Sequence, residues 1–298
     1  MAGTRDKLVL GFPEYCPQAE AVAVRLGVPC EIIDVHHFPD GESLVRLPSD
    51  LPPEVIICRS LDHPNTKLVE LALAAGTARE LGARRLTLVA PYLCYMRQDM
   101  AFRSGEAVSQ RVVGRHLARL FDTVVAVDPH LHRTPRLAQA VPAPAALTVT
   151  AAGPIGRFLA QQLDAPLILA PDTEAQQWAR AVARHGGLAY GVALKERRGD
   201  RQVEVELPKL DLRGRPVVLV DDIASTGRTL AAAARQALAR GAREVHAMVV
   251  HALFVDDALE HVHGAGVDRL WSTDSITHAT NAVELAPLIA DALAAARS

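Results

Sequence analysis

The sequence has few cysteines, and they follow no recognisable pattern. Only four occur in 298 residues, Cys16, Cys30, Cys58 and Cys94, and their spacings are wide and irregular. Such spacings match neither a zinc-binding pattern nor a disulfide framework. We therefore expect four structural, buried thiols in a reducing cytoplasm.

An excess of one charge and a long hydrophobic run are also missing. The 32 Lys and Arg residues nearly balance the 34 Asp and Glu residues, so the net charge is −2. A nearly neutral protein has no overall field to hold polyanions, which argues against nucleic acid as a partner. The longest apolar stretches are of strand length, well below the roughly 20 residues that span a bilayer. The N-terminal residues do not resemble a signal peptide, so we expect a cytoplasmic protein that does not bind membranes.

What the sequence does contain is an alternation of short apolar runs with longer helical patterns. The length gives a prior of two domains at roughly 150 residues each, and the alternation predicts an α/β fold with mostly parallel sheets flanked by helices. The predicted strands are Lys7–Phe12, Glu31–Val35, Glu54–Arg59, Arg85–Pro91, Thr123–Asp128, Pro166–Pro171, Ala189–Leu194, Pro216–Asp222, Glu244–His251 and Arg269–Ser272. The clearest predicted helices are Asn65–Leu81, Ala107–Leu120, Ala152–Gln162, Glu174–His185, Thr229–Arg240 and Ala282–Ala295.

A Pro- and Ala-rich stretch near the middle of the chain is the best candidate for a linker. It covers residues 142–150, with strand and helix patterns on both sides. We therefore predict an N-terminal domain at 1–146 and a C-terminal domain at 147–298. Whether the last helix packs on the N-terminal domain is left open.

The strongest local motif runs from Val217 to Leu230. An apolar strand ends in Asp221 and Asp222, and a loop of small residues then leads into a helix. Ligands of open α/β sheets bind at this edge. The two carboxylates suit ribose hydroxyls or hydrated magnesium, and the loop can turn N–H and hydroxyl groups toward a phosphate. A plain helix N-cap is the alternative, but it does not explain two carboxylates after an apolar strand.

This motif resembles the phosphoribosyl-diphosphate (PRPP) binding signature of type I phosphoribosyltransferases and PRPP synthetases. Further segments favour the second family, also called ribose-phosphate pyrophosphokinase, and the resemblance covers nearly the whole chain. It implies two tandem phosphoribosyltransferase-like domains. It also implies a ribose 5-phosphate site made of Asp221, Asp222, Ser225, Thr226, Gly227, Arg228 and Thr229.

Two segments of the first half resemble the ATP-binding segments of that family. One is the Phe38–Glu42 loop, where the resemblance assigns Phe38, Asp40 and Glu42 to ATP, although Pro-Asp-Gly is also an ordinary turn sequence. The other begins at Pro91 and contains Arg97, Gln98 and Asp99. The Arg97 guanidinium is suited to phosphate oxygens. A solvated salt-bridge network is the alternative for this second segment.

The resemblance assigns His130 to the Mg-ATP site, and it makes Asp172 a magnesium or ribose ligand. Each follows an apolar strand, where the family has Val-Asp-x-His and Ser-Pro-Asp. Because magnesium prefers oxygen ligands, a hydrogen bond from His130 to phosphate or to metal-bound water is an equal alternative. The family's Gly-Gly after the Asp is replaced here by Thr173-Glu174, and Glu174 is either a further carboxylate ligand or a favourable acid in the first helical turn.

A charged segment between two strand patterns resembles the catalytic loop of the family. Lys195 and Arg197 keep its Lys-x-Arg spacing and are the predicted catalytic residues, although a solvated hairpin tip is the alternative. Residues two apart on a strand point to the same side, so both cations can face one phosphate chain.

The implied reaction is the Mg²⁺-dependent transfer of a diphosphoryl group from ATP to ribose 5-phosphate. The resemblance also implies a homo-oligomer in which an ATP site takes its Phe38–Glu42 loop from a neighbouring subunit. Two alternatives stay open, a type I phosphoribosyltransferase and a non-catalytic regulatory relative. Departures from the family pattern at Glu174, Glu196, Ser225 and Arg228 keep the second alternative open.

Overall fold

The computed structural model describes residues 6–131, 133–198, 202–206 and 211–296, and for 194–198 and 202–206 it describes the backbone only. Contacts between residues divide the chain into two compact units. The first unit comprises Met1–Val149 together with Ala286–Ser298, and the second comprises Thr150–Leu285.

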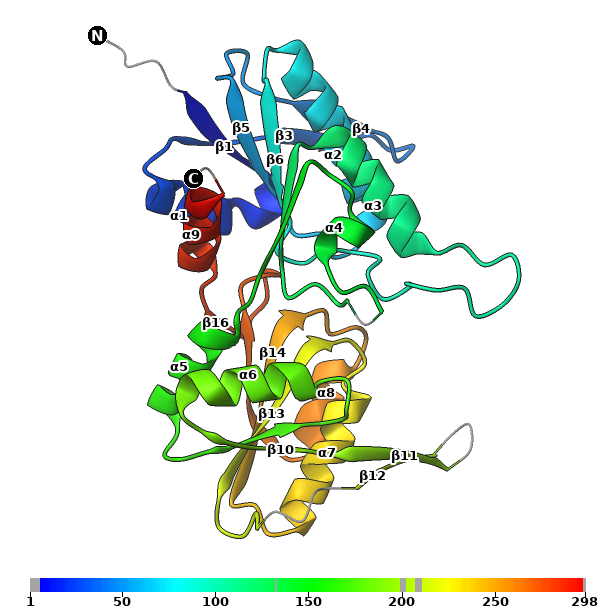
Figure 1. Cartoon of the computed structure of the whole chain (residues 1–298), viewed down its shortest axis with the longest axis vertical. Helices are drawn as coiled ribbons and strands as arrows, with labels where there is room; N and C mark the ends of the chain where they lie inside the picture. The colour runs from blue at the N-terminus through cyan, green and yellow to red at the C-terminus, as the bar shows by residue number, and fades with distance from the viewer. Residues whose placement is uncertain (1–5, 132, 199–201, 207–210, 297–298) are drawn as a thin grey trace. The chain divides into compact units, whose positions relative to one another are not determined.

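The first unit is built on a six-stranded parallel sheet with the order β2-β1-β5-β6-β7-β8. In chain order its strands are β1 (Lys7–Gly11), β2 (Cys30–Ile32), β5 (Glu54–Cys58), β6 (Arg85–Val89), β7 (Thr123–Val127) and β8 (Ala145–Val149). The helical segments are η1 (Pro13–Tyr15), α1 (Cys16–Leu26), α2 (Pro64–Glu80), α3 (Ser109–Leu120), α4 (Leu137–Ala140) and α9 (Ala286–Ala295). Figure 1 shows α1 and α9 side by side on one face of this sheet and α2 and α3 on the other. The connection from β1 to β2 runs toward one edge of the sheet, and those from β5 through β6 to β7 run toward the other. Because such crossovers are right-handed, their helices lie on opposite faces of the sheet.

The second unit repeats the plan with the parallel strand order β10-β9-β13-β14-β15-β16. Its strands are β9 (Leu167–Ala170), β10 (Ala189–Val192), β13 (Pro216–Ala224), β14 (Glu244–Ala252), β15 (Val267–Thr273) and β16 (Asn281–Val283). Its helices are α5 (Ala152–Gln162), α6 (Gln176–Gly186), α7 (Arg228–Ala239) and α8 (Ala258–Gly264). The central strands are apolar and buried along nearly their whole length, as expected for a parallel sheet covered on both faces. The predicted α/β class is confirmed.

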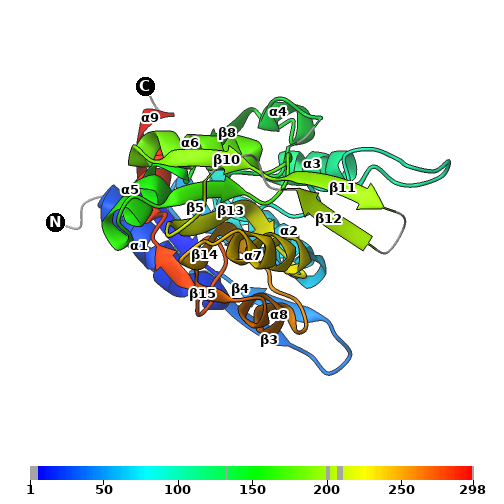
Figure 2. The ribbon, with the colours of Figure 1, turned by 90° about the horizontal axis from the view of Figure 1, so that it is seen from below.

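Each unit also carries an antiparallel hairpin outside its main sheet. In the first unit β3 (Asp34–His37) pairs with β4 (Ser43–Arg46), and in the second β11 (Leu194–Arg198) pairs with β12 (Gln202–Glu206). Figure 2 shows the second hairpin continuing outward from β10.

Three predictions about single elements differ from the structure. The expected linker at 142–150 does contain the boundary between the two units, after Val149, but its residues Ala145–Val149 form β8, which pairs in parallel with β7 at the edge of the first sheet. The expected strand Glu31–Val35 is divided between β2 in the sheet and β3 in the hairpin. The last predicted helix begins at Ala286 rather than Ala282, since residues Asn281–Val283 pair with β15 as β16. In the described part of the chain no helix combines the length and apolar character that crossing a bilayer requires.

Candidate functional site

The strand β13 and the helix α7 position the strongest motif of the sequence. Residues Pro216–Val220 of β13 are buried between the helices, and the strand continues through Asp221 and Asp222 to Ala224. Gly227 then begins α7 with φ 68°, and a Cβ at this position would lie 2.6 Å from Cγ2 of Val262. Only glycine fits this combination of positive φ and close packing.

The loop between β13 and α7 opens to solvent at the end of the sheet. Thr226 and Arg228 are exposed, whereas Ser225 and Thr229 are half-buried. Because Gly227 has no side chain that could cap α7, the first N–H groups of this helix form the positive end that binds phosphate groups in many α/β proteins.

Three carboxylates gather where β9 and the neighbouring β13 end. Asp222 is 4% exposed, its N–H group donates to Oδ1 of Asp221 (2.9 Å), and its own Oδ1 accepts from the N–H group of Ile223 (2.8 Å). Burial raises the pKa of Asp221 well above its ordinary value, and the charges of Asp222 and then Asp172 raise it further. The structure thus brings the Asp172 carboxylate within electrostatic range of Asp221 at this edge of the sheet.

Asp172 also shapes the turn before α6. Its Oδ1 accepts hydrogen bonds from the N–H groups of Glu174 (3.0 Å) and Ala175 (3.1 Å). This turn accommodates Thr173 and Glu174 where the family pattern has two glycines. The Glu174 side chain is exposed and lies two residues before α6 begins, so the interpretation of Glu174 as an acid in the first helical turn is wrong.

In the first unit, the Phe38–Glu42 loop connects β3 to β4. The N–H group of Phe38 donates to the carbonyl of Glu42 (2.8 Å), and the N–H group of Gly41 donates to the carbonyl of Phe38 (2.9 Å). Oδ1 of Asp40 accepts from the N–H group of Glu42 (3.2 Å). The Phe38 ring is 41% exposed and meets His36 edge-on, with 4.8 Å between the ring centroids. A tight turn therefore presents an aromatic ring and two exposed carboxylates to solvent.

A buried carboxylate in α2 holds the base of this hairpin. Glu70 is 1% exposed, and it accepts hydrogen bonds from His37 (2.6 Å) in β3, from Ser43 (2.8 Å) in β4 and from Arg59 after β5. Burial alone would raise the pKa of Glu70, but the hydrogen bonds from Arg59, His37 and Ser43 bring it below its ordinary value. Sequence reasoning missed Glu70, and the available signal was an acidic residue on the buried face of a helix beside Leu71 and Ala74.

We expect Glu70→Gln to lower the free energy of unfolding by about 1.5–3 kcal/mol, because hydrogen bonds to charged partners contribute about that much. Thermal and urea unfolding measure this change. Glu80→Gln at the end of α2 is the matched control and should cost less than about 0.5 kcal/mol. Equal stability of the Glu70 variant and the parent would contradict the anchoring role.

The segment after β6 places its three predicted ATP residues in different surroundings. Arg97 is exposed, and Nε2 of Gln98 donates to the carbonyl of Met100 (3.4 Å). Asp99 is buried and forms an ion pair with Nη1 of Arg133 (3.0 Å), whose N–H group also donates to it (3.3 Å). Asp99 thus has the contacts of the salt-bridge alternative, whereas Arg97 is available to a ligand. No local pattern connected Arg133 to Asp99, since 34 residues separate them.

His130 follows β7 at the carboxyl edge of the first sheet. The chain turns there through Asp128, which has φ 36° and donates its N–H group to the carbonyl of Val149 (2.9 Å). His130 is half-buried. It belongs to the first unit, whereas the other predicted magnesium residue, Asp172, belongs to the second.

Lys195 and Arg197 occupy alternate positions of β11. Lys195 pairs with Val205 and Arg197 with Val203 in the antiparallel register with β12. Their side chains lie outside the described part of the structure. The backbone thus forms a hairpin, which is compatible both with a catalytic loop and with a solvated hairpin tip.

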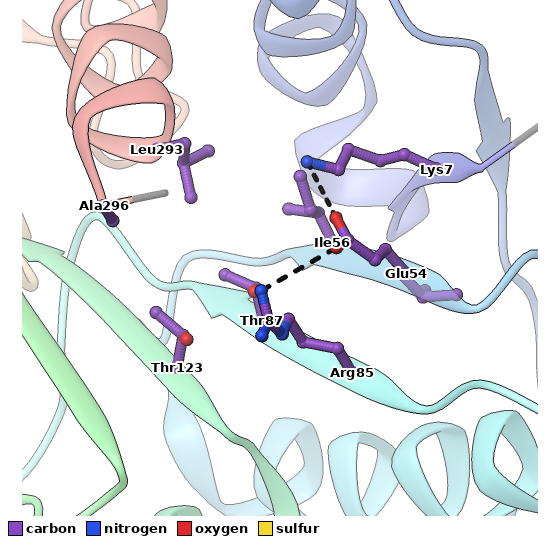
Figure 3. A pocket seen from close by; sticks show the side chains of 9 residues that line it. Lys7, Glu54, Ile56, Arg85, Thr87, Thr123, Leu293 and Ala296 are labelled. Atoms are coloured by element: carbon purple, nitrogen blue, oxygen red, sulfur yellow. Dashed lines mark ion pairs between the residues drawn. The ribbon is translucent and has the colours of Figure 1, made fainter. Parts of the chain in front are cut away.

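A separate pocket lies at the opposite edge of the first sheet. The strands β1, β5 and β6 begin at this pocket with Lys7, Glu54 and Arg85. Glu54 forms ion pairs with Lys7 (3.0 Å) and Arg85 (3.7 Å) in the pocket lining (Figure 3). Leu293 and Ala296 of the C-terminal segment complete the lining. None of the predicted site residues lines this pocket, because they follow the carboxyl ends of the strands or lie in the hairpins.

Comparison with known proteins supports the same division of the chain. Residues 10–120 match the N-terminal domain of ribose phosphate pyrophosphokinase, and residues 151–284 match the phosphoribosyl transferase domain. The ribose-phosphate pyrophosphokinase of Methanopyrus kandleri is 33% identical, with 96% of this chain and 98% of that protein covered. The protein of the same name from Saccharolobus solfataricus is 37% identical over 86% of this chain and 89% of its own length.

A solved structure has the same fold along the whole chain. The phosphoribosylpyrophosphate synthetase from Mycobacterium smegmatis superposes with a TM-score of 0.84 at 22% identity, covering 98% of this chain and 99% of the other. The predicted pair of phosphoribosyltransferase-like domains is therefore confirmed, and so is the family resemblance. With both family domains in order and relatives above 30% identity along nearly their full length, the chain belongs to the ribose-phosphate pyrophosphokinase family.

Proposed function

We propose that this protein is an enzyme that synthesises PRPP from ribose 5-phosphate and ATP and releases AMP. The anomeric hydroxyl attacks the β-phosphorus of ATP in line and releases its proton to solvent. The bond from the β-phosphorus to the bridging oxygen breaks, and AMP leaves with that oxygen. Family membership supports this reaction. The observation that carries the proposal is the pair of carboxylates near the end of β13, followed by a helix N-terminus, that of α7, whose N–H groups are suited to a phosphate.

The second unit supplies the ribose 5-phosphate site in this proposal. Asp221 and Asp222 accept hydrogen bonds from the ribose hydroxyls, and the loop formed by Ser225, Thr226, Gly227, Arg228 and Thr229 holds the 5-phosphate. The half-buried position of Asp221 supports this role, because a hydrogen bond is stronger away from water.

ATP is assigned to the hairpin loop and to the segment after β6. Phe38 flanks the adenine, Asp40 and Glu42 bind the base or ribose, and Arg97 and Gln98 contact the nucleotide. Asp99 holds Arg133 and thereby shapes this segment, so its assignment to ATP is the least direct of the six. The exposure of Phe38 and Arg97 supports contacts with a ligand.

Magnesium fits the donor set of the second unit. Asp172, together with the acid pair, offers the oxygen ligands that Mg²⁺ prefers. Burial, and then the charges of Asp222 and Asp172, raise the pKa of Asp221, and a bound cation would offset this effect. When bound, the metal neutralises the diphosphate charge. His130 would contact either the metal or a phosphate oxygen, and both roles stay open.

Lys195 and Arg197 are the proposed catalytic residues. Phosphoryl-type transfers depend mainly on positioning and charge stabilisation, so two cations beside the transferring group lower the barrier without a covalent intermediate. We also propose a homo-oligomer, which light scattering on the purified protein tests directly.

The decisive experiment mixes the purified protein with ribose 5-phosphate, ATP and Mg²⁺ and follows the products by phosphorus NMR. We expect AMP and PRPP in equal amounts and no turnover without ribose 5-phosphate. Release of ADP, or no nucleotide product, would contradict the proposal. A phosphoribosyltransferase would instead consume PRPP without ATP, and a non-catalytic relative would bind the ligands without turnover.

A further inference from the structure

A cluster of potential metal ligands lies in the second unit, outside the motifs assigned above. It consists of Glu244 and His246 in β14 and Asp268 in β15, whose ligand atoms all lie within 4.8 Å of one another. Among the residues that the structure describes, this is the sole group of three His, Cys, Asp or Glu residues that meets so closely.

His246 is the central member of this cluster. It is 2% exposed, yet neither of its ring nitrogens has a hydrogen-bond partner within the described part of the chain. Buried polar atoms normally have such partners, and leaving one without costs free energy. Its Nε2 lies 3.7 Å from Oε2 of Glu244, slightly too far for a hydrogen bond. The imidazole is therefore buried beside carboxylate oxygens but bonded to none of them.

The backbone of β15 brings Asp268 to the same place. Val245 pairs with Val267 and Ala247 with Leu270, so one residue of β14, His246, lies opposite two residues of β15, Asp268 and Arg269. Two residues opposite one define a β-bulge, a feature that redirects side chains and is often found near functional sites. The Trp271 ring lies next to the imidazole of His246, with 5.2 Å between the ring centroids.

Two arginines, Arg243 and Arg269, lie near the members of this cluster. Nη2 of Arg243 donates to Oε1 of Glu244 (2.7 Å), which leaves Oε2 facing His246. Burial lowers the pKa of His246. The charges of Glu244 and Asp268 oppose this shift, whereas the charges of Arg269 and Arg243 add to it.

We propose that Glu244, His246 and Asp268 form a binding site for a divalent transition metal of the zinc class. One imidazole and two carboxylates are typical zinc ligands, whereas an imidazole is unfavourable for Mg²⁺. Zinc–ligand distances of about 2.0–2.2 Å require the ligand atoms to approach slightly, and the exposed Asp268 side chain is free to rotate inward. A fourth position stays open to water.

This site is separate from the proposed catalytic one. In the parallel register of β13 and β14, Glu244 pairs with Pro216, whereas Asp221 pairs with Val249. The five-residue offset in that register corresponds to about 16 Å along the sheet. The metal would thus bridge β14 and β15 at the amino edge and stabilise the unit without touching the substrates.

The test is a Zn²⁺ titration of tag-free, metal-stripped protein against a chromogenic chelator, with excess Mg²⁺ present to occupy oxygen-only sites. We expect the parent to bind one Zn²⁺ that Asp268→Asn and His246→Gln bind at least tenfold more weakly. Glu260→Gln removes an exposed charge on α8 and is the matched control, which should bind like the parent. Zn²⁺ should also raise the melting temperature of the parent but not that of Asp268→Asn.

Two results would overturn the proposal. One is a parent that binds no Zn²⁺ in excess Mg²⁺. The other is Zn²⁺ binding that survives in Asp268→Asn but is lost in the Asp221→Asn, Asp222→Asn double variant, which would place the ion at the carboxyl edge. Because Asp268 is exposed, its Asn variant should fold like the parent, so a loss of binding there reports on the site itself.

Discussion

Lys195→Ala is expected to lower kcat by on the order of 10²–10³, the usual effect of removing one donor that stabilises transition-state charge. The ammonium group is placed on the oxygens of the transferring diphosphoryl group, where negative charge is redistributed as the bond to AMP breaks. A cation on a hairpin outside the main sheet should engage the substrate fully only in the closed complex. We therefore expect kcat and kcat/KM to fall together, while the affinity for ATP stays nearly unchanged.

Steady-state kinetics combined with ATP binding by calorimetry measure both quantities. Arg197→Ala should behave like the Lys195 variant, since the two residues occupy alternate positions of β11. Arg184→Ala removes an exposed cation from the last turn of α6 and should leave turnover unchanged. An active parent whose Lys195 variant retains more than half of its kcat would contradict the catalytic role.

The second large effect concerns the acid pair. Replacing Asp221 and Asp222 together by Asn should lower kcat/KM for ribose 5-phosphate by on the order of 10²-fold or more, because each hydrogen bond to a charged acceptor contributes about 1.5–3 kcal/mol. The same change should raise the melting temperature of the metal-free protein. It removes negative charge from a half-buried place where the pKa of Asp221 is already raised by burial and by neighbouring carboxylates.

Activity and thermal unfolding of the double variant are measured on the same preparation, in chelator for the unfolding experiment. Asp211→Asn, at an exposed position before β13, is the matched control and should change neither quantity appreciably. A binding role predicts lost activity with equal or greater stability. If the double variant melts well below the parent, or keeps full activity, the acid pair is structural.

Much of both main sheets could be read from single apolar runs, and the exceptions have a common cause. β8 and β16 are edge strands, and pairing with β7 and β15, neighbours that lie elsewhere in the sequence, fixes them as strands. The hairpin of β3 and β4 is similar, because its strands are mostly exposed and lack the apolar signal of a core strand. Apolar sequence patterns indicate which strands are buried, and they miss these segments because the segments are held mainly by backbone hydrogen bonds.

The α/β class, the two-domain plan and the motifs at the ends of the strands follow from the amino-acid pattern, because a strand–loop–helix segment such as Asp221 to Thr229 is contiguous and its chemistry is local. The folded structure was needed to show which distant residues meet. It placed Asp172 beside the acid pair, paired Asp99 with Arg133, put Glu70 beneath the hairpin, and aligned a bulge in β15 with His246. Each of these contacts joins residues from different elements, and strand order and register, rather than any local pattern, bring such residues together.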